Sequence, residues 1–168
     1  GTAAYNVVFN GASNTIAGAT TFSNTGTVTL GDGGDTTAFT GGVTITAPSQ
    51  VNIGGTVQAT NSAISIGDSG TPIVLTANST ISGNTSGNIT LGGTINGAYT
   101  LDVNTTGTTT FSGVIGGSTP LTSVTTNTGG TGSGDTGSGT IGSGGTGSGD
   151  TGSGDTDSGG TGTGIGSG

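Results

Sequence analysis

The chain has 168 residues, 41 of them Gly, and carries a formal net charge of −8 without a single Lys, Arg or His. A chain without basic side chains cannot neutralise phosphates or anionic membrane surfaces, which excludes nucleic-acid binding and membrane adsorption driven by charge. The absence of Cys excludes disulfides and thiolate metal sites. Gly, Thr and Ser make up more than half of the residues, and because they are poor helix formers a helical protein is not expected.

Residues 1–126 consist of short apolar or β-branched runs separated by Gly, Asn, Ser and Asp. In Thr27–Leu30, Val43–Thr46 and Ala63–Ile66, apolar side chains alternate with hydroxyls, which is the period of a strand with one face toward a core. Val, Ile, Thr, Tyr and Phe favour the pleated backbone, and Gly, Asn and Asp favour the turns between runs. The runs are 5–9, 20–22, 27–30, 43–46, 51–53, 56–58, 63–66, 73–76, 88–91, 99–103, 108–111 and 121–124. The sequence therefore predicts an all-β domain over residues 1–126.

Two all-β architectures fit these runs. The favoured one is a parallel β-solenoid (β-helix), in which rungs stack and columns of Val, Ile, Leu, Ala and Thr fill the interior. A β-sandwich, jelly roll or pilin-like fold is the alternative, although four Phe and two Tyr supply a thick two-sheet core poorly. The segment 27–32 returns in similar form as 63–68, 36 residues later. Interpreted as two rungs of about 18 residues, this spacing predicts that Leu30 and Ile66 lie on the same face.

Residues 127–168 form a low-complexity tail built from Gly, Ser, Thr and Asp. The pentapeptide Gly-Ser-Gly-Asp-Thr occurs at 132–136, 147–151 and 152–156. Such a composition buries too little surface to offset its ordering entropy, which favours a flexible linker. The alternative is an ordered tail that packs as an extended chain within an assembly.

The residue inventory offers little chemistry for catalysis. His, Cys, Glu and Lys are absent, so Asp is the only side chain that could activate a hydroxyl. Asp32 and Asp35, like Asp155 and Asp157, lie in Gly-rich turns without the apolar neighbours that raise a carboxyl pKa. We therefore expect no enzyme activity and no cofactor. Asp32 and Asp35 are weak candidates for a Ca²⁺ site, because two close carboxylates are ligands that this ion accepts.

Residues 108–122 read Thr-Thr-Thr-Phe-Ser-Gly-Val-Ile-Gly-Gly-Ser-Thr-Pro-Leu-Thr. This stretch resembles the strand repeat of large secreted bacterial adhesins and autotransporter passengers of the filamentous-haemagglutinin-like type. Segments 43–66 and 88–103 are similar to the same β-strand-repeat proteins, so the resemblance covers residues 38–126. It implies a β-helix with an adhesive, stalk or matrix role.

Composition and resemblance together predict a structural role. We expect an extracellular building block of a bacterial surface appendage, filament or coat, whose main partner is another copy of itself. Its strand edges lack Lys, and its only prolines are Pro48, Pro72 and Pro120, so little blocks strand addition. The Thr/Asn/Gly-rich, Cys-free composition is typical of proteins exported to the bacterial surface.

A binding module of a larger surface protein is the alternative function, with adhesion or ice binding as its activity and a host or matrix glycan as a candidate partner. Thr-x-Thr arrays on a flat solenoid face would suit ice. Such arrays occur at 25–29 and 44–46, but they do not recur at the expected rung spacing.

Overall fold

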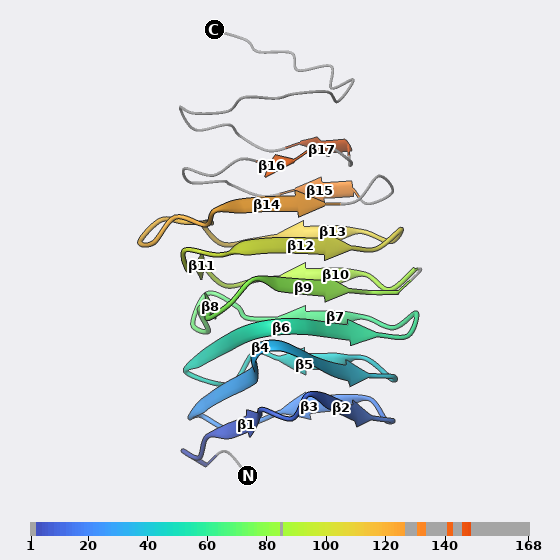
Figure 1. The fold of residues 1–168 in the computed structure, drawn as a ribbon, viewed down its shortest axis with the longest axis vertical. Coiled ribbons are helices and arrows are strands. Elements are labelled where there is room, and N and C mark those ends of the chain that lie inside the picture. Colours follow the sequence, from blue (N-terminus) through green and yellow to red (C-terminus); the bar gives the residue numbers. More distant parts are fainter. Residues whose placement is uncertain (1–2, 85, 127–130, 134–140, 143–145, 149–168) are drawn as a thin grey trace, which may run out of the picture.

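The structure is a computed structural model that describes residues 3–84, 86–126, 131–133, 141–142 and 146–148. These residues form stacked parallel strands without a helix, in a β-solenoid of about 5 turns (Figure 1). The predicted all-β class and the favoured solenoid architecture are confirmed. Over the same ranges there is no helix of the length and apolarity needed to cross a membrane.

The strands define three faces that run along the solenoid. The first face contains β1 (Val7–Phe9), the first parts of β4 (Thr27–Phe39) and β6 (Gln50–Ala59), β8 (Ile73–Leu75) and β11 (Ile95–Asn96). The second face contains β2 (Ser13–Ile16), the later parts of β4 and β6, β9 (Ser79–Ser82), β12 (Thr100–Asn104), β14 (Ser123–Thr126) and β16 (Ile141–Gly142). The third face contains β3 (Thr20–Phe22), β5 (Val43–Ile45), β7 (Ile64–Ile66), β10 (Ile89–Leu91), β13 (Thr109–Phe111), β15 (Thr131–Ser133) and β17 (Thr146–Ser148).

The rungs are longer than the sequence echo indicated. On the first face the paired residues follow one another at intervals of 20–23 residues, in the order Val7, Val28, Val51, Ile73, Ile95 and Ile115. The interpretation of 36 residues as two rungs of about 18 is therefore wrong. Leu30 pairs with Phe9 and Ile53 on the first face, whereas Ile66 pairs with Ile45 and Leu91 on the third. The two similar segments share a Gly-Asp sequence whose Gly has positive φ, at positions 31 and 67, but they are not stacked on one another.

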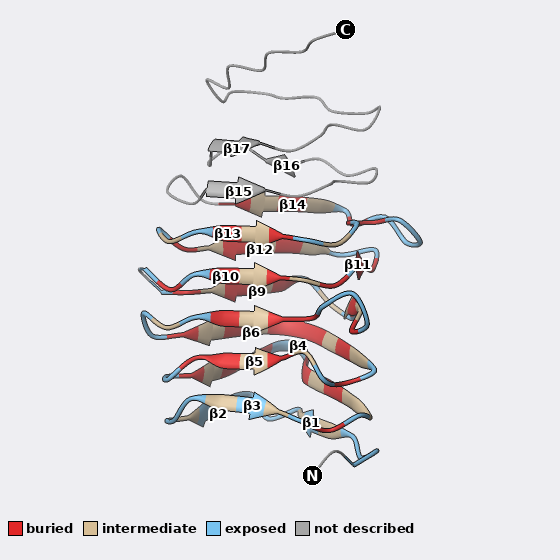
Figure 2. Cartoon of the chain, turned by 180° about the vertical axis from the view of Figure 1, so that it is seen from behind, coloured by how far each residue is buried: buried red, intermediate tan, exposed pale blue. Residues whose placement is uncertain are grey.

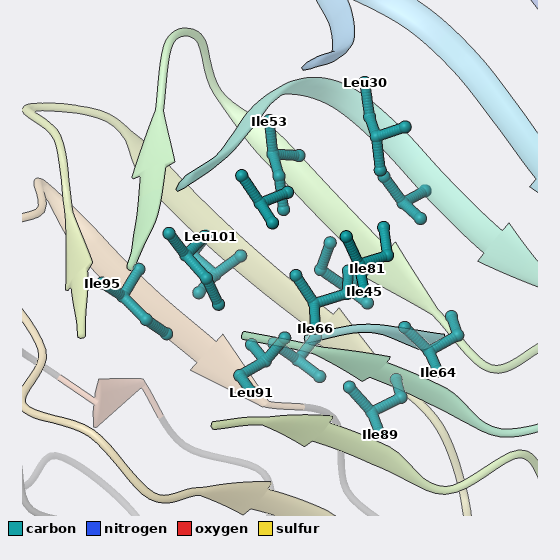
Figure 3. Close-up of a cluster of buried hydrophobic side chains, with 14 of the residues drawn as sticks. Leu30, Ile45, Ile53, Ile64, Ile66, Ile81, Ile89, Leu91, Ile95 and Leu101 are labelled. Atoms are coloured by element: carbon teal, nitrogen blue, oxygen red, sulfur yellow. The ribbon is translucent and has the colours of Figure 1, made fainter. Parts of the chain in front are cut away.

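The core is a set of aliphatic columns between the three faces. In strands such as β5, β7 and β12, buried and half-buried residues alternate, whereas in β1, β2 and β3 half-buried and exposed residues alternate (Figure 2). The labelled side chains of Figure 3, among them Leu30, Ile53 and Ile81, converge from different strands on this interior. Each rung shields the next, so columns of medium-sized side chains suffice where a sandwich would need larger ones.

Two strands pass continuously around a corner between the first and second faces. β4 turns through Gly31–Gly34, where Gly31, Gly33 and Gly34 all have positive φ, and β6 turns through Gly54 and Gly55. The pairing of β4 with β6 shifts register between Leu30 and Asp35, because β4 carries extra residues at this corner. A Cβ atom on Gly55 would lie 2.4 Å from the Asp35 carbonyl oxygen, so only Gly fits there.

Strand pairing continues past residue 126. β15 pairs with β13, β16 pairs with β14, and β17 pairs with β15. Thr131 pairs with Thr146, an interval of 15 residues, which equals three of the pentapeptides in the tail. The remainder of the predicted tail, with Asp155 and Asp157, lies outside the described residues.

Candidate functional site at the open N-terminal rung

The first rung is formed by β1, β2 and β3, which are edge strands. β1 and β2 pair only with β4, and β3 pairs only with β5. No described strand pairs with the other edge of these strands, which faces the N-terminal end of the solenoid (Figure 1). Their backbone groups on that side are therefore available to another strand.

The inward side chains of this rung are only half-buried. Val7, Phe9, Ile16 and Phe22 pack against the core but remain partly accessible. Their partners one rung later are Val28, Leu30, Phe39 and Ile45, all of which are at most 1% exposed. The difference is that the second rung has neighbours on both sides. One more rung at the N-terminal end would therefore complete the burial of the first.

Aromatic side chains are concentrated at this end. Phe9, Phe22 and Phe39 form a cluster of edge-to-face contacts, with ring centroids 6.1–6.4 Å apart. Phe39 is fully buried, whereas Phe9 and Phe22 present part of their rings at the end of the solenoid. Large aromatic surfaces contribute strongly to association when they become covered.

Hydrogen bonds hold the chain before β1 against the second rung. The buried Asn24 side chain donates from Nδ2 to the Tyr5 carbonyl at 2.9 Å and to the Thr27 carbonyl at 3.2 Å. The Thr27 amide donates to Asn6 Oδ1 at 2.9 Å. These contacts hold the chain next to β1 in position, so the edge itself would lose little conformational entropy when a strand docks on it.

Charge does not protect this end from association. The first ionisable side chain after Tyr5 is Asp32, and the first proline is Pro48, so neither a charged residue nor a proline occurs in β1, β2 or β3. Natural edge strands usually carry Lys, Pro or a bulge that prevents pairing with another chain. The first rung has none of these in its strands.

The structure brings the predicted pair Asp32 and Asp35 together at the corner of β4. The Asp32 amide donates to Asp35 Oδ2 at 3.1 Å. Hydrogen bonding to the Asp35 side chain, and then the negative charge of Asp35, raise the pKa of Asp32. Asp35 is 9% exposed, whereas Asp32 is open to solvent. Among the described residues no third acidic side chain joins the pair. Ca²⁺ would need its remaining ligands from carbonyls and water, so binding here stays a prediction.

Sequence reasoning missed ordered columns of hydroxyls on the outer surface. On the third face one outward column contains Thr21, Thr44, Ser65, Thr90 and Thr110. On the second face another contains Ser13, Thr36, Thr56, Thr80 and Thr125, with Asp102 between the last two. The Thr-x-Thr arrays at 25–29 and 44–46 do not recur at rung spacing, as expected, since Thr27 and Thr29 pair with Gln50 and Asn52, but single hydroxyls do recur. The alternation within each run was the signal that could have revealed these columns.

A shallow open groove of about 630 Å³ lies beside the hydroxyl column of the third face. Its lining includes Gly67, Gly92 and Gly113, which have no side chains, and the hydroxyls of Ser65 and Thr90. A Cβ atom on Gly92 would lie 2.5 Å from the Gly67 carbonyl oxygen, so close rung contact requires these glycines. Asp68 is the only charged residue in the lining.

The described residues define a parallel β-solenoid in which β1, β2 and β3 are edge strands. Comparisons with protein-family models, with curated proteins and with solved structures found no match for this chain.

Proposed function

We propose that this chain is a structural building block of an extracellular bacterial surface appendage, filament or coat, and that it self-associates through β-strand contacts. The observation that carries the proposal is the open first rung. It combines three unpaired strand edges with half-exposed Val7, Phe9, Ile16 and Phe22, and its strands carry no charge. The adhesin-like strand repeats and the composition of the chain support the location.

The occupant we assign to the open rung is a second copy of the chain. A rung from another copy would extend the sheets and bury the four half-exposed side chains as fully as their partners in the second rung. If the opposite end of the second copy docks, the contact joins two different surfaces. Such a contact does not close and therefore builds a linear polymer.

Phe22→Lys tests this proposal. The new ammonium lies at the accessible end of the core, where it can extend into solvent and prevent a further rung from docking. Thr110→Lys is the matched control, because it adds the same charge to an outward position of the same face, far from the open rung. Circular dichroism establishes that each variant is folded.

The readout is sedimentation of the full chain at tens of micromolar, with electron microscopy of any polymer. We expect the wild type and Thr110→Lys to associate and Phe22→Lys to remain monomeric. A wild-type chain that is a stable monomer at these concentrations would overturn the proposal. Equal association of both variants would place the contact elsewhere.

The hydroxyl columns favour a second function, that of a binding module for ice or for a host or matrix glycan. Stacked rungs place Thr21, Thr44, Ser65, Thr90 and Thr110 at regular intervals of about 4.8 Å. The test is retention of the chain on ice or on insoluble polysaccharide. Thr90→Tyr should abolish retention, and Thr80→Tyr on the second face is the control. Binding by single particles that do not polymerise would favour this function over the first.

A further inference from the structure

The described residues contain two Asn-Gly sequences in very different surroundings. Asn10-Gly11 lies in the turn between β1 and β2, on the open rung, whereas Asn96-Gly97 begins in β11, which has paired residues on both sides in the stack. In an Asn-Gly sequence the following backbone nitrogen can attack the side-chain amide, because Gly has no Cβ to shield it or to restrict its backbone. The two Asn-Gly sequences therefore allow the same reaction to be compared in two environments within one chain.

Asn10-Gly11 is free to react. Both residues are exposed, and no described residue forms a hydrogen bond with the Asn10 side chain or the Gly11 amide. Among the described residues, the hydrogen bond made to this pair comes from Asn14 Nδ2, which donates to the Gly11 carbonyl at 2.7 Å. The carbonyl takes no part in the attack, and the Gly11 amide makes no hydrogen bond to a described residue, although the Asn14 side chain lies beside Gly11.

Asn96-Gly97 is held in place. Asn96 Oδ1 accepts hydrogen bonds from the Ser118 amide at 2.9 Å and the Thr119 amide at 3.0 Å. The Gly97 amide donates to the Thr119 carbonyl at 3.1 Å, and Gly97 is buried against Leu75. Both reacting groups are therefore engaged, and several hydrogen bonds must break before the nitrogen can approach the side chain.

We propose that Asn10 is a site of spontaneous deamidation. The Gly11 nitrogen loses its proton to solvent base and bonds to Asn10 Cγ, the Cγ–Nδ2 bond breaks, and the side-chain nitrogen leaves as ammonia. Water then opens the resulting five-membered imide. Cleavage between Cγ and the Gly11 nitrogen gives an aspartyl residue, and cleavage at the backbone carbonyl gives an isoaspartyl residue. Both products carry one additional negative charge at neutral pH.

This modification regulates the open rung, an inference that rests on the proposed function. Deamidation introduces a charge into a rung whose strands have none, and the isoaspartyl product also lengthens the turn between β1 and β2 by one backbone carbon. Burying an unpaired carboxylate against a second copy is unfavourable. Ends that have not been covered therefore lose their ability to add a copy as the protein ages.

Mass spectrometry of the aged full chain tests the site. The protein is held at mildly alkaline pH and cleaved with chymotrypsin after Phe and Tyr, and the fragments are examined for the exchange of NH for O. We expect Asn10 to convert at least about tenfold faster than Asn96, because the hydrogen bonds of Asn96 must break first. Asn10→Gln, which would need a larger ring, should remove the fast reaction. Equal rates at the two positions, or a faster Asn96, would overturn the proposed site.

Sedimentation of fresh variants tests the regulation separately. Asn10→Asp should associate more weakly than the wild type, whereas Asn104→Asp, which adds the same charge to β12 on the second face, should associate normally. Equal association of Asn10→Asp and the wild type would overturn the regulatory role. If fresh wild type does not associate, the proposed function fails and the regulatory role fails with it, while the mass measurement still decides whether Asn10 is the reactive residue.

Discussion

The first and second rungs have the same architecture but different environments. Val28, Leu30, Phe39 and Ile45 are completely buried, whereas the residues beneath them in the first rung are half-exposed. Neither hydrophobicity nor strand geometry accounts for this, since Phe9 and Phe22 are larger than Leu30 and Ile45. In a solenoid a side chain is buried by the neighbouring rung, and stability is therefore a property of rung interfaces. The following substitutions test this comparison.

Removing the same atoms from an inner and an outer rung should have unequal effects. Ile66→Ala, in the third face between Ile45 and Leu91, should lower the free energy of unfolding by about 2–5 kcal/mol. Ile16→Ala should cost about 1 kcal/mol, because the side chain is already half-exposed and leaves no closed cavity. Urea unfolding below the concentration at which the chain associates measures both. Equal losses would mean that the open rung is already covered.

Glycines of the two rungs should also respond differently. A Cβ atom on Gly41 would lie 2.4 Å from the Ala19 amide nitrogen in the rung below, so Gly41→Ala should destabilise the chain by about 1–3 kcal/mol. Gly18 has no atom within 4 Å of its would-be Cβ atom, and Gly18→Ala should change stability by less than about 1 kcal/mol. Thermal unfolding followed by circular dichroism distinguishes the two. A destabilising Gly18→Ala would show that another chain occupies this end.

The smallest effect on stability is expected at the corner of β4 that carries Asp32 and Asp35. Because Asp35 raises the pKa of Asp32, the folded chain binds a proton there more readily than the unfolded chain does, and stability at this site increases as pH falls through the raised pKa. Asp32→Asn should slightly increase thermal stability at pH 7. This gain in stability should vanish in acid, because Asp32 is then protonated and no longer repels Asp35.

Asp102→Asn, which removes one charge from the second face, is the control for Asp32→Asn. A gain at the corner that persists unchanged at low pH would show that repulsion between the two carboxylates is not its cause.

The strands and the stacked-rung architecture were predictable from the sequence, but the length of the rungs was not. Alternation placed the runs 43–46 and 108–111 close to the observed β5 and β13. Rung length could not be deduced, because the corners between strands differ in their number of residues. The interval from Ile64 to its partner Ile89 is 25 residues, and that from Ile89 to Thr109 is 20. Since Val, Ile, Leu, Phe and Thr can replace one another in an inward column, no strict repeat is required.

The candidate site was predictable only in part. The lack of Lys, and of Pro before Pro48, indicated unprotected strand edges, but which edges are open depends on the position of each strand in the stack. The proximity of Asp32 and Asp35 followed from their spacing, whereas the shift in pKa depends on how Gly31–Gly34 folds the corner. Neighbouring rungs, which contribute most of the environment of each residue, lie about 20 residues away in sequence.

The direction of the backbone hydrogen bonds has a mechanical consequence. Hydrogen bonds between parallel strands run along the long axis of the solenoid. A pull on the two ends of the solenoid therefore acts along these bonds, and we expect the rungs to separate one at a time. A rung such as that from Val51 to Ile73 contains 22 residues, and its release adds about 75 Å of chain. A fibre of such units would lengthen under tension in repeated steps of similar size, dissipating work at each step while the remaining rungs stay folded.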